Sequence, residues 1–282
     1  MKRTRIISIF SFLLLSDVTA GYAGDAVDAQ EWIAANMGGD DIHAAVLEYE
    51  TDGASGKRHE FAIYDAPCLY RWQAFGGEKD HIERSLWSSG GIVTEKTWND
   101  GQVVLSSAEN TNLKDALRNV RLFLGQASET RFDGLSRARR MPDEAGRKMY
   151  LLDAGDGNRV RYELQADFPP LPLAKIEEFP GDGVLRHISY GEWLVQDGFY
   201  FPGEVSIEYI RIDGGEVPPK SEWKLVQIHS INQSQPFMAF VPMLGMPENV
   251  QEWQCDKSGN AIISIARPGV LHEKYGEFFP TK

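Results

Sequence analysis

The chain has 282 residues, of which 42% are apolar and 11% aromatic, so it can bury a sizeable core and is not a disordered chain. It carries 29 Lys and Arg against 41 Asp and Glu, a net charge of −12. This charge repels nucleic acid and anionic membrane surfaces, and we expect neither as a partner.

Residues 1–23 have the pattern of a secretory signal peptide. A basic head precedes the apolar segment Ile6–Leu15, and small residues ending at Ala20 and Ala23 offer cleavage sites. The alternative, a membrane anchor, would need roughly 20 apolar residues, more than this segment holds. Cleavage would leave 26 basic and 40 acidic residues, a net charge of −14. We therefore expect a periplasmic protein with no membrane span, folded as one domain over residues 24–282.

The only cysteines are Cys68 and Cys255. In an exported chain such a pair predicts a disulfide, because unpaired thiols are a liability outside the cytosol. The alternative is two separate buried thiols. A metal site needs more ligands than this pair supplies, and we predict none.

The first third of the chain reads as a helix followed by strands. Residues Asp25–Met37 predict a helix that stops at Gly38, since Ala29, Ile33 and Met37 recur every four residues. Two hairpins should follow, the second around the turn Asn99-Asp100-Gly101. A single strand, limited in pairing by the preceding proline, and a polar connection over residues 76–84 should separate them. The strands expected are His43–Glu50, Lys57–Asp65, Cys68–Phe75, Gly91–Trp98 and Gln102–Ser107.

Residues Asn112–Gly125 give the best helical pattern in the chain. Asn112 can cap the helix, Gly125 can end it, and one stripe is apolar. This stripe must cover a sheet face, either as ordinary core or as a mobile lid. Its members are Leu113, Ala116, Leu117, Val120, Phe123 and Leu124.

A charged loop over Glu129–Gly146 follows, with four arginines that are solvated or contact an anion: Arg131, Arg137, Arg139 and Arg140. Residues Lys148–Leu152 and Arg159–Ala166 then predict two strands, the second with one buried and one wet face. The prolines of Phe168–Pro172 interrupt the pattern.

Residues 184–242 predict an antiparallel meander. Three apolar, β-branched runs, Leu185–Val195, Val205–Ile212 and Trp223–Ile231, are separated by Asp-Gly turns. The apolar face changes phase inside the second and third runs, which predicts a bulge in each and a sheet that bends toward barrel-like closure. The alternative is that other elements cover both faces of the sheet at those ends. Phe237–Val241 and Ala261–Ala266 are further short strands.

Within this meander, Asp197-Gly198-Phe199-Tyr200-Phe201-Pro202 is followed by Trp223–Ile228, Asn232 and Phe240. The segment resembles the outer-membrane lipoprotein-sorting (lipoprotein carrier-like) half-barrel superfamily. The resemblance implies a mainly β (α+β) fold, in which a curved antiparallel sheet forms an incomplete barrel with helices packed on its concave side. It also implies a periplasmic location and an apolar cavity that holds acyl chains. The matched landmarks Gly198, Pro202, Asn232 and Phe240 are turn and packing positions.

No motif for catalysis, a cofactor or a metal is present, so we predict a protein that is not an enzyme. Ser221 and Lys224 fit S-x-x-K, but they lie in a strand pattern and lack the companion motifs. Six histidines are scattered, and only His187 and His229 could meet across the meander. A hydrolase with a dispersed site would draw on these residues.

Aromatic residues are plentiful in the predicted strands and serve either packing or a ligand wall. We predict a ligand-lining set of Trp98, Leu117, Phe123, Trp193, Tyr209 and Trp223. The expected function is a periplasmic binding or carrier protein that shelters a lipid or an acylated protein. The alternative is an envelope protein-interaction or stress-sensing module whose cavity is filled by its own helix.

Overall fold

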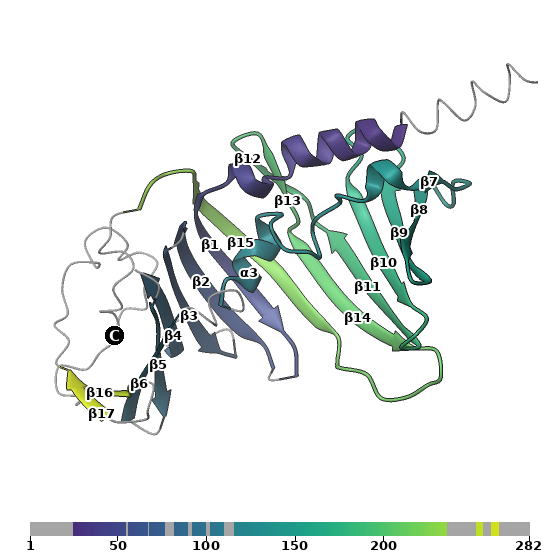
Figure 1. Cartoon of the computed structure of the whole chain (residues 1–282). Helices are drawn as coiled ribbons and strands as arrows, with labels where there is room; N and C mark the ends of the chain where they lie inside the picture. The colour runs from purple at the N-terminus through teal and green to yellow at the C-terminus, as the bar shows by residue number, and fades with distance from the viewer. Residues whose placement is uncertain are drawn as a thin grey trace, which may run out of the picture.

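The computed structural model describes residues 25–54, 56–66, 68–76, 82–89, 92–99, 102–109, 116–235, 252–255 and 261–264. Figure 1 shows a long curved sheet with short helices lying across one of its faces. The sheet does not close into a barrel, which confirms the predicted mainly β fold with an incomplete barrel.

Fifteen strands form the main sheet, and its neighbours are antiparallel except for the parallel pair β6 and β16. From one edge to the other the order is β17 (Ala261–Ser264), β16 (Glu252–Cys255), β6 (Gln102–Glu109), β5 (Ile92–Asn99), β4 (Ile82–Ser89), β3 (Cys68–Phe75), β2 (Arg58–Asp65), β1 (Ala44–Asp52), β15 (Ser221–Ile231), β14 (Glu204–Arg211), β11 (Val184–Gly191), β10 (Pro172–Phe179), β9 (Asn158–Gln165), β8 (Arg147–Gly155) and β7 (Arg139–Arg140). A separate hairpin pairs β12 (Leu194–Gln196) with β13 (Phe199–Phe201).

Most predicted strands are confirmed within a few residues, including both early hairpins and the meander β11–β14–β15. Strand β3 pairs on both sides along its length, so the expected limit on its pairing was wrong. Strands β4 and β10 were not predicted: β4 begins inside the expected polar connection over residues 76–84, and β10 begins at Pro172, the last residue of the expected proline break. The predicted strand Phe237–Val241 lies outside the described residues.

The predicted bulge in β15 is present, but the one in β14 is not. Against β1, strand β15 skips one residue between Ile228 and Ser230 and another between Leu225 and Gln227. Strand β14 instead pairs with β11 in continuous register, and its phase change leaves Ile210 half exposed on the outer face. The described part of the chain therefore does not cover the outer face at this end of β14.

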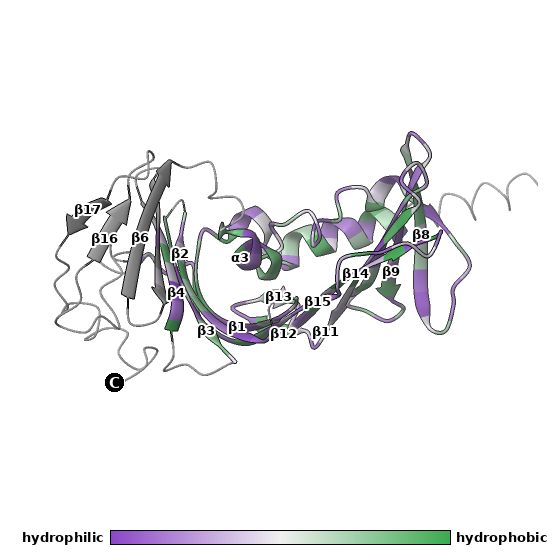
Figure 2. Ribbon diagram, turned by 90° about the horizontal axis from the view of Figure 1, so that it is seen from below, coloured by the Kyte–Doolittle hydropathy of each residue, from purple (hydrophilic) through white to green (hydrophobic). Residues whose placement is uncertain are grey.

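The helices lie on the concave side of the sheet, as Figure 2 shows edge-on. A helix over residues 25–36, as predicted, and α3 (Arg118–Phe123) are linked to the sheet by the turns η1 (Gly39–Asp41) and η3 (Leu135–Arg137). Within the described residues α3 is shorter than the predicted Asn112–Gly125 helix. Its predicted apolar stripe is confirmed from Ala116 to Leu124, because each member there is at most 5% exposed.

Two apolar clusters cover opposite faces of the sheet. The larger one fills the concave side, where residues of α3 and of the helix over 25–36 pack on β1, β9, β11, β14 and β15. The smaller one lies on the opposite face of β1–β3 and centres on Phe61, Tyr70 and Trp72. The fully buried side chains of the larger cluster place the centre of the core between α3 and the sheet.

Candidate functional site

The centre of the concave face is a row of side chains across four strands. The ladder places Thr51 of β1 opposite Trp223 of β15, Trp223 opposite Val205 of β14, and Val205 opposite Tyr190 of β11. Paired residues in a sheet share a face, and their sequence neighbours point to the other face. One face of these strands is therefore largely aromatic and apolar, and α3 contacts it at Trp223.

Five of the six predicted lining residues lie in or against this concave cluster. Phe123 is completely buried with its ring 5.1 Å from that of Tyr49, and Leu117 and Trp223 are 3% and 8% exposed. Trp193 and Tyr209 are partly buried against the same cluster. The side chain of Trp98 lies outside the described part of the chain.

A buried polar cluster that the sequence analysis missed joins α3 to this wall. Glu60 is 1% exposed and accepts hydrogen bonds from Gln73 (2.7 Å), Asn119 of α3 (3.2 Å) and Thr51 (3.3 Å). The guanidinium of Arg71 lies 3.8 Å from the Glu60 carboxylate. The cluster therefore satisfies a buried carboxylate of β2 with groups from three other elements, β1, β3 and α3.

The same cluster holds α3 directly. Asn119 accepts a hydrogen bond of 3.0 Å from the indole N–H of Trp223, and Arg71 donates to the Ala116 carbonyl at 3.2 Å. The Arg118 guanidinium lies 5.7 Å from the centre of the Trp223 ring. These polar contacts attach α3, a helix of six residues, to the apolar concave face of the sheet.

A second set of buried charges continues along the concave face. Lys175 lies 3.2 Å from Glu177 and donates to the carbonyls of Ser128 and Arg131 at 2.7 and 3.1 Å. Arg186 bonds Glu177 and approaches Glu129. These contacts attach the segment that follows α3 to β10 and β11.

The pKa of Glu129 reflects its place in this set. Burial raises the pKa, but a backbone N–H, the Ser128 hydroxyl and the charges of Arg118 and Arg186 outweigh it, so the pKa lies below its usual value. Burial likewise raises the pKa of Tyr49, the phenol closest to Glu60 and Arg71. These groups stay in their ordinary charge states at neutral pH and offer no displaced acid or base.

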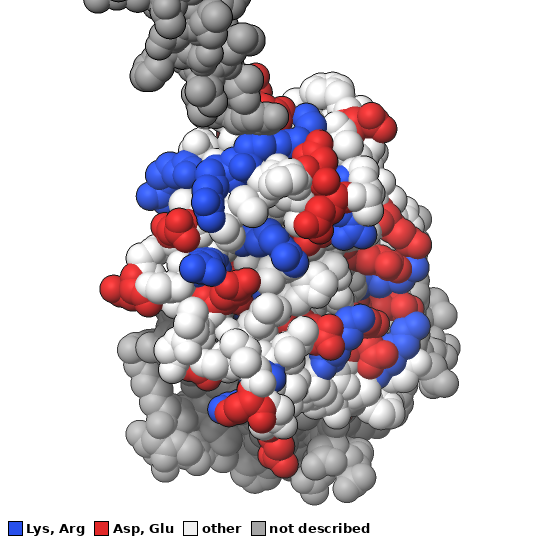
Figure 3. All heavy atoms as spheres, turned by 90° about the vertical axis from the view of Figure 1, so that its right-hand side faces the viewer, with Lys and Arg blue, Asp and Glu red and all other residues white. Residues whose placement is uncertain are grey.

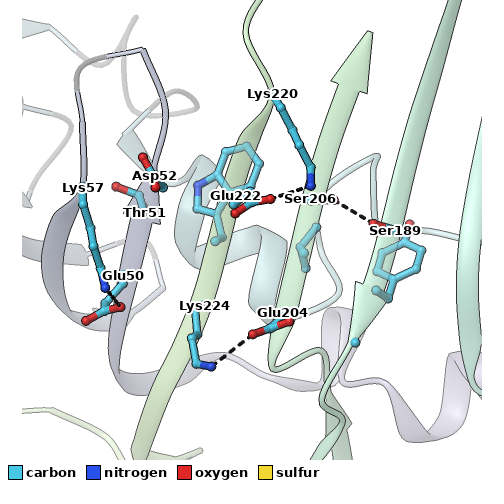
Figure 4. A pocket seen from close by; sticks show the side chains of 14 residues that line it. Glu50, Thr51, Asp52, Lys57, Ser189, Glu204, Ser206, Lys220, Glu222 and Lys224 are labelled. Atoms are coloured by element: carbon cyan, nitrogen blue, oxygen red, sulfur yellow. Dashed lines mark hydrogen bonds and ion pairs between the residues drawn. The ribbon is translucent and has the colours of Figure 1, made fainter. Parts of the chain in front are cut away.

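A cavity of about 370 Å³ opens on the opposite, outer face of β1, β15, β14 and β11. Figure 4 shows Lys–carboxylate pairs around it: Lys57 with Glu50, Lys220 with Glu222, and Lys224 with Glu204. Ser189 and Ser206 share a hydrogen bond of 2.7 Å on its floor. An acyl chain would have to desolvate these charges, so this cavity suits polar groups and not a lipid tail.

The histidines are arranged differently from the prediction. Strand β14 lies between the strands of His187 and His229, so the two do not meet. Instead, Glu48 lies between His59 and His229, with its two carboxylate oxygens 3.0 and 3.1 Å from their Nε2 atoms. The partners are 11 and 181 residues apart in sequence, too far for a pattern to reveal.

The dispersed hydrolase candidates do not converge. Ser221 and Lys224 are three apart on β15 and therefore point to opposite faces of the sheet. Among the described residues no group of three or more His, Cys, Asp and Glu is arranged to hold a metal ion. No helix in the part of the chain that the structure describes is long and apolar enough to cross a membrane.

Lysine and arginine side chains gather at the end of the molecule formed by β7–β9, as the blue surface in Figure 3 shows. Arg131 and Arg140 of the predicted basic loop are in ion pairs, with Asp40 and Asp143 respectively. Arg137 and Arg139 are exposed. Lys148 and Tyr150 at this end bond Asp25 and thereby anchor the start of the first helix.

The predicted Cys68–Cys255 disulfide stays a prediction. Cys68 is half-buried at the start of β3, beside the smaller apolar cluster. The side chain of Cys255 in β16 lies outside the described residues. In sheet order, β4, β5 and β6 separate β3 from β16.

The fold has relatives among solved structures. A DUF1329 family protein from Desulfovibrio piger is 11% identical, with a TM-score of 0.40 over 79% of this chain and 97% of that one. A LolA superfamily protein from Nitrosomonas europaea is 10% identical, with a TM-score of 0.41 over 77% and 97%. A putative outer membrane lipoprotein-sorting protein domain from Vibrio parahaemolyticus is 10% identical, with a TM-score of 0.34 over 70% and 88%.

Two of these structures are described as LolA superfamily or lipoprotein-sorting proteins, the group that the meander resembles in sequence. No family model matches the chain, and no curated protein matches it in sequence. The likeness is one of fold.

Proposed function

We propose that this protein is an exported, non-enzymatic binding protein that shelters a lipid chain or acyl group between α3 and the concave face of its sheet. The predicted basic and apolar leader over residues 1–23 supports export to the cell envelope. Binding rests on the concave wall.

One observation carries the proposal: a short helix covers the apolar centre of the sheet. Trp223 lies against it, and Val205 and Tyr190 continue the same row across β14 and β11. A helix of six residues has little stability of its own, so it stays in place through its contacts with the sheet. A ligand that covers the same wall can replace those contacts, and the displaced helix can be solvated at modest cost.

The depth of burial favours a second candidate, a protein-interaction module with a self-filled cavity. Phe123 and Val120 are completely buried against the sheet. Their apolar contacts stabilise the closed form by roughly 1.5–3 kcal/mol for each large side chain. In this candidate α3 is permanent core and the binding surface lies elsewhere on the molecule.

Lipid extraction and binding separate the two candidates. The mature protein should be purified from envelope fractions and analysed by native mass spectrometry, then titrated with a fluorescent fatty acid and a fluorescent phospholipid. Lipid binding predicts a co-purifying mass in the lipid range and saturable binding of at least one probe. Repeated recovery of the bare chain, with no saturable binding of either probe, would contradict the proposal and support the self-filled module.

A paired variant locates the binding. Phe123→Ala removes the α3 side chain that contacts Tyr49 and should change the affinity for the probe. Phe61→Ala removes a side chain of similar burial from the opposite face and serves as the control, since it should change stability without changing affinity.

A further inference from the structure

We propose that the aromatic rim, defined as Trp32, Phe168, Val195 and Tyr200, is a docking surface for a partner protein segment with an apolar centre and a basic border. The proposal is independent of what the concave face holds. It rests on the contacts, exposure and surrounding charge of these four residues.

The rim is continuous although three distant segments form it. Tyr200 lies opposite Val195 in the hairpin β12–β13. The ring of Trp32, on the first helix, is 5.0 Å from that of Tyr200 and 5.9 Å from that of Phe168, in the connection between β9 and β10. Both ring pairs are edge-on, the geometry of aromatic side chains in genuine contact.

Two of the four rim side chains are mostly exposed to solvent, although the rim residues contact one another. Phe168 is 80% exposed and Val195 is 61% exposed, while Trp32 and Tyr200 are partly buried. Contiguous apolar surface of this kind marks interaction sites, whereas singly scattered apolar residues do not. Trp and Tyr are also the side chains that contribute most at the centres of protein interfaces.

Firmly buried neighbours hold the rim in place. Phe201, next to Tyr200, is completely buried, and Ile33, next to Trp32, is 4% exposed. A surface fixed in this way loses little conformational freedom on binding, which favours affinity.

The charge around the rim identifies the kind of partner. Exposed acidic residues lie within four positions of rim residues in the sequence: Asp28, Glu31, Asp167 and Asp197. These carboxylates repel an anionic membrane and complement a partner with Lys or Arg around its apolar contact. A second copy of this chain is disfavoured, because it carries the same acidic border and the same net negative charge.

The test uses the mature full chain and two synthetic amphipathic helical peptides, one of Leu and Lys and one of Leu and Glu. Fluorescence anisotropy should show saturable binding of the Leu/Lys peptide and much weaker binding of the Leu/Glu peptide. Phe168→Ser combined with Val195→Ser should weaken the first interaction about tenfold or more, and Asp167→Lys should weaken it as well.

Two matched controls test whether replacing any exposed apolar residue, or any exposed acidic residue, would weaken peptide binding equally. Ile212 is 78% exposed but lies at the end of β14, and Glu216 is an exposed acid in the loop that follows it. Ile212→Ser and Glu216→Lys should each leave the affinity within about twofold of the wild-type value, because they are surface changes outside the rim. All variants should keep the wild-type melting temperature, because the substituted side chains are exposed.

Three results would overturn the proposal. The first is equal binding of the Leu/Lys and Leu/Glu peptides. The second is an equal loss of affinity in the rim variants and the controls. The third is binding of phosphatidylcholine or phosphatidylglycerol vesicles that depends on Phe168 while neither peptide binds, since that result would assign the rim to a membrane.

Discussion

The side chain of Asn119 accepts a 3.0 Å hydrogen bond from the indole of Trp223, and its own amide donates to Glu60 at 3.2 Å. One carboxamide thus connects α3 to two different strands of the concave face. Asn suits this position because it offers a donor and an acceptor on the same short side chain. The contact is the clearest polar link between the helix and the wall that it covers.

Asn119→Ala should destabilise the protein by about 1–3 kcal/mol, because it leaves the Trp223 indole and one Glu60 oxygen unsatisfied in a buried site. Urea unfolding followed by fluorescence measures this change. If α3 is a lid, the same variant should also bind the fluorescent lipid faster. Ile188→Val, a buried change on β11, costs roughly 0.5–1.5 kcal/mol and is the control for lost stability alone. Equal lipid association rates in the two variants would show that α3 does not open.

Gly125→Ala should be strongly destabilising. Gly125 has φ +71°, and a Cβ there would lie 2.3 Å from the Met37 carbonyl oxygen, where the end of α3 meets the end of the first helix. We expect a loss of about 2–4 kcal/mol in the free energy of unfolding. Gly146→Ala is the matched control, since Gly146 has φ +75° with open space around it and should cost only about 1 kcal/mol. Equal losses at the two positions would refute the close contact.

The lowered pKa of Glu129 predicts a pH-dependent stability. A carboxyl whose folded pKa is below its unfolded value of about 4.3 stabilises the fold above that pH. The contribution disappears as the pH falls through the lower folded value. The stability difference between wild type and Glu129→Gln should therefore be constant near neutrality and shrink below about pH 4. A difference that grew on acidification would mean that Arg118 and Arg186 do not favour the ionised form.

Counting reactive thiols tests the predicted disulfide between the two cysteines. If Cys68 and Cys255 are bonded, the unfolded protein purified from the periplasm should react with no equivalent of a thiol reagent until it is reduced, and with two equivalents afterwards. Two reactive thiols without reduction would show that Cys68 packs against the outer cluster as a thiol.

The sequence predicted the elements that follow from local residue patterns. It missed elements that depend on contacts between residues far apart in the chain. The hairpin between β5 and β6 follows from Asn99-Asp100-Gly101, whose residues tolerate the turn. Strand β10 was missed because it begins with Pro172 and its inward positions carry Lys175 and Glu177. These charges can be buried because they pair with each other and because Lys175 also bonds the carbonyls of Ser128 and Arg131, which lie 47 and 44 residues earlier. The strand therefore lacks the alternation of apolar residues that would have predicted it.

The candidate site, too, could be predicted only where a local sequence pattern determines it. Apolar periodicity correctly predicted that Leu117 and Phe123 face the sheet. It gave no indication of Glu60, because the Asn119 amide that bonds it lies 59 residues away. The aromatic rim was missed for the same reason, since its contacts join the first helix to a loop and a hairpin more than a hundred residues later.

Quenching of Trp223 by lipids with brominated acyl chains tests the central claim most directly. If a chain enters between α3 and the sheet, brominated fatty acid should quench the fluorescence of wild-type protein, and Trp223→Phe should remove most of that quenching. Trp72→Phe, on the opposite face, should leave it intact. Quenching unchanged by Trp223→Phe, or absent at saturating lipid, would contradict a ligand site on the concave face.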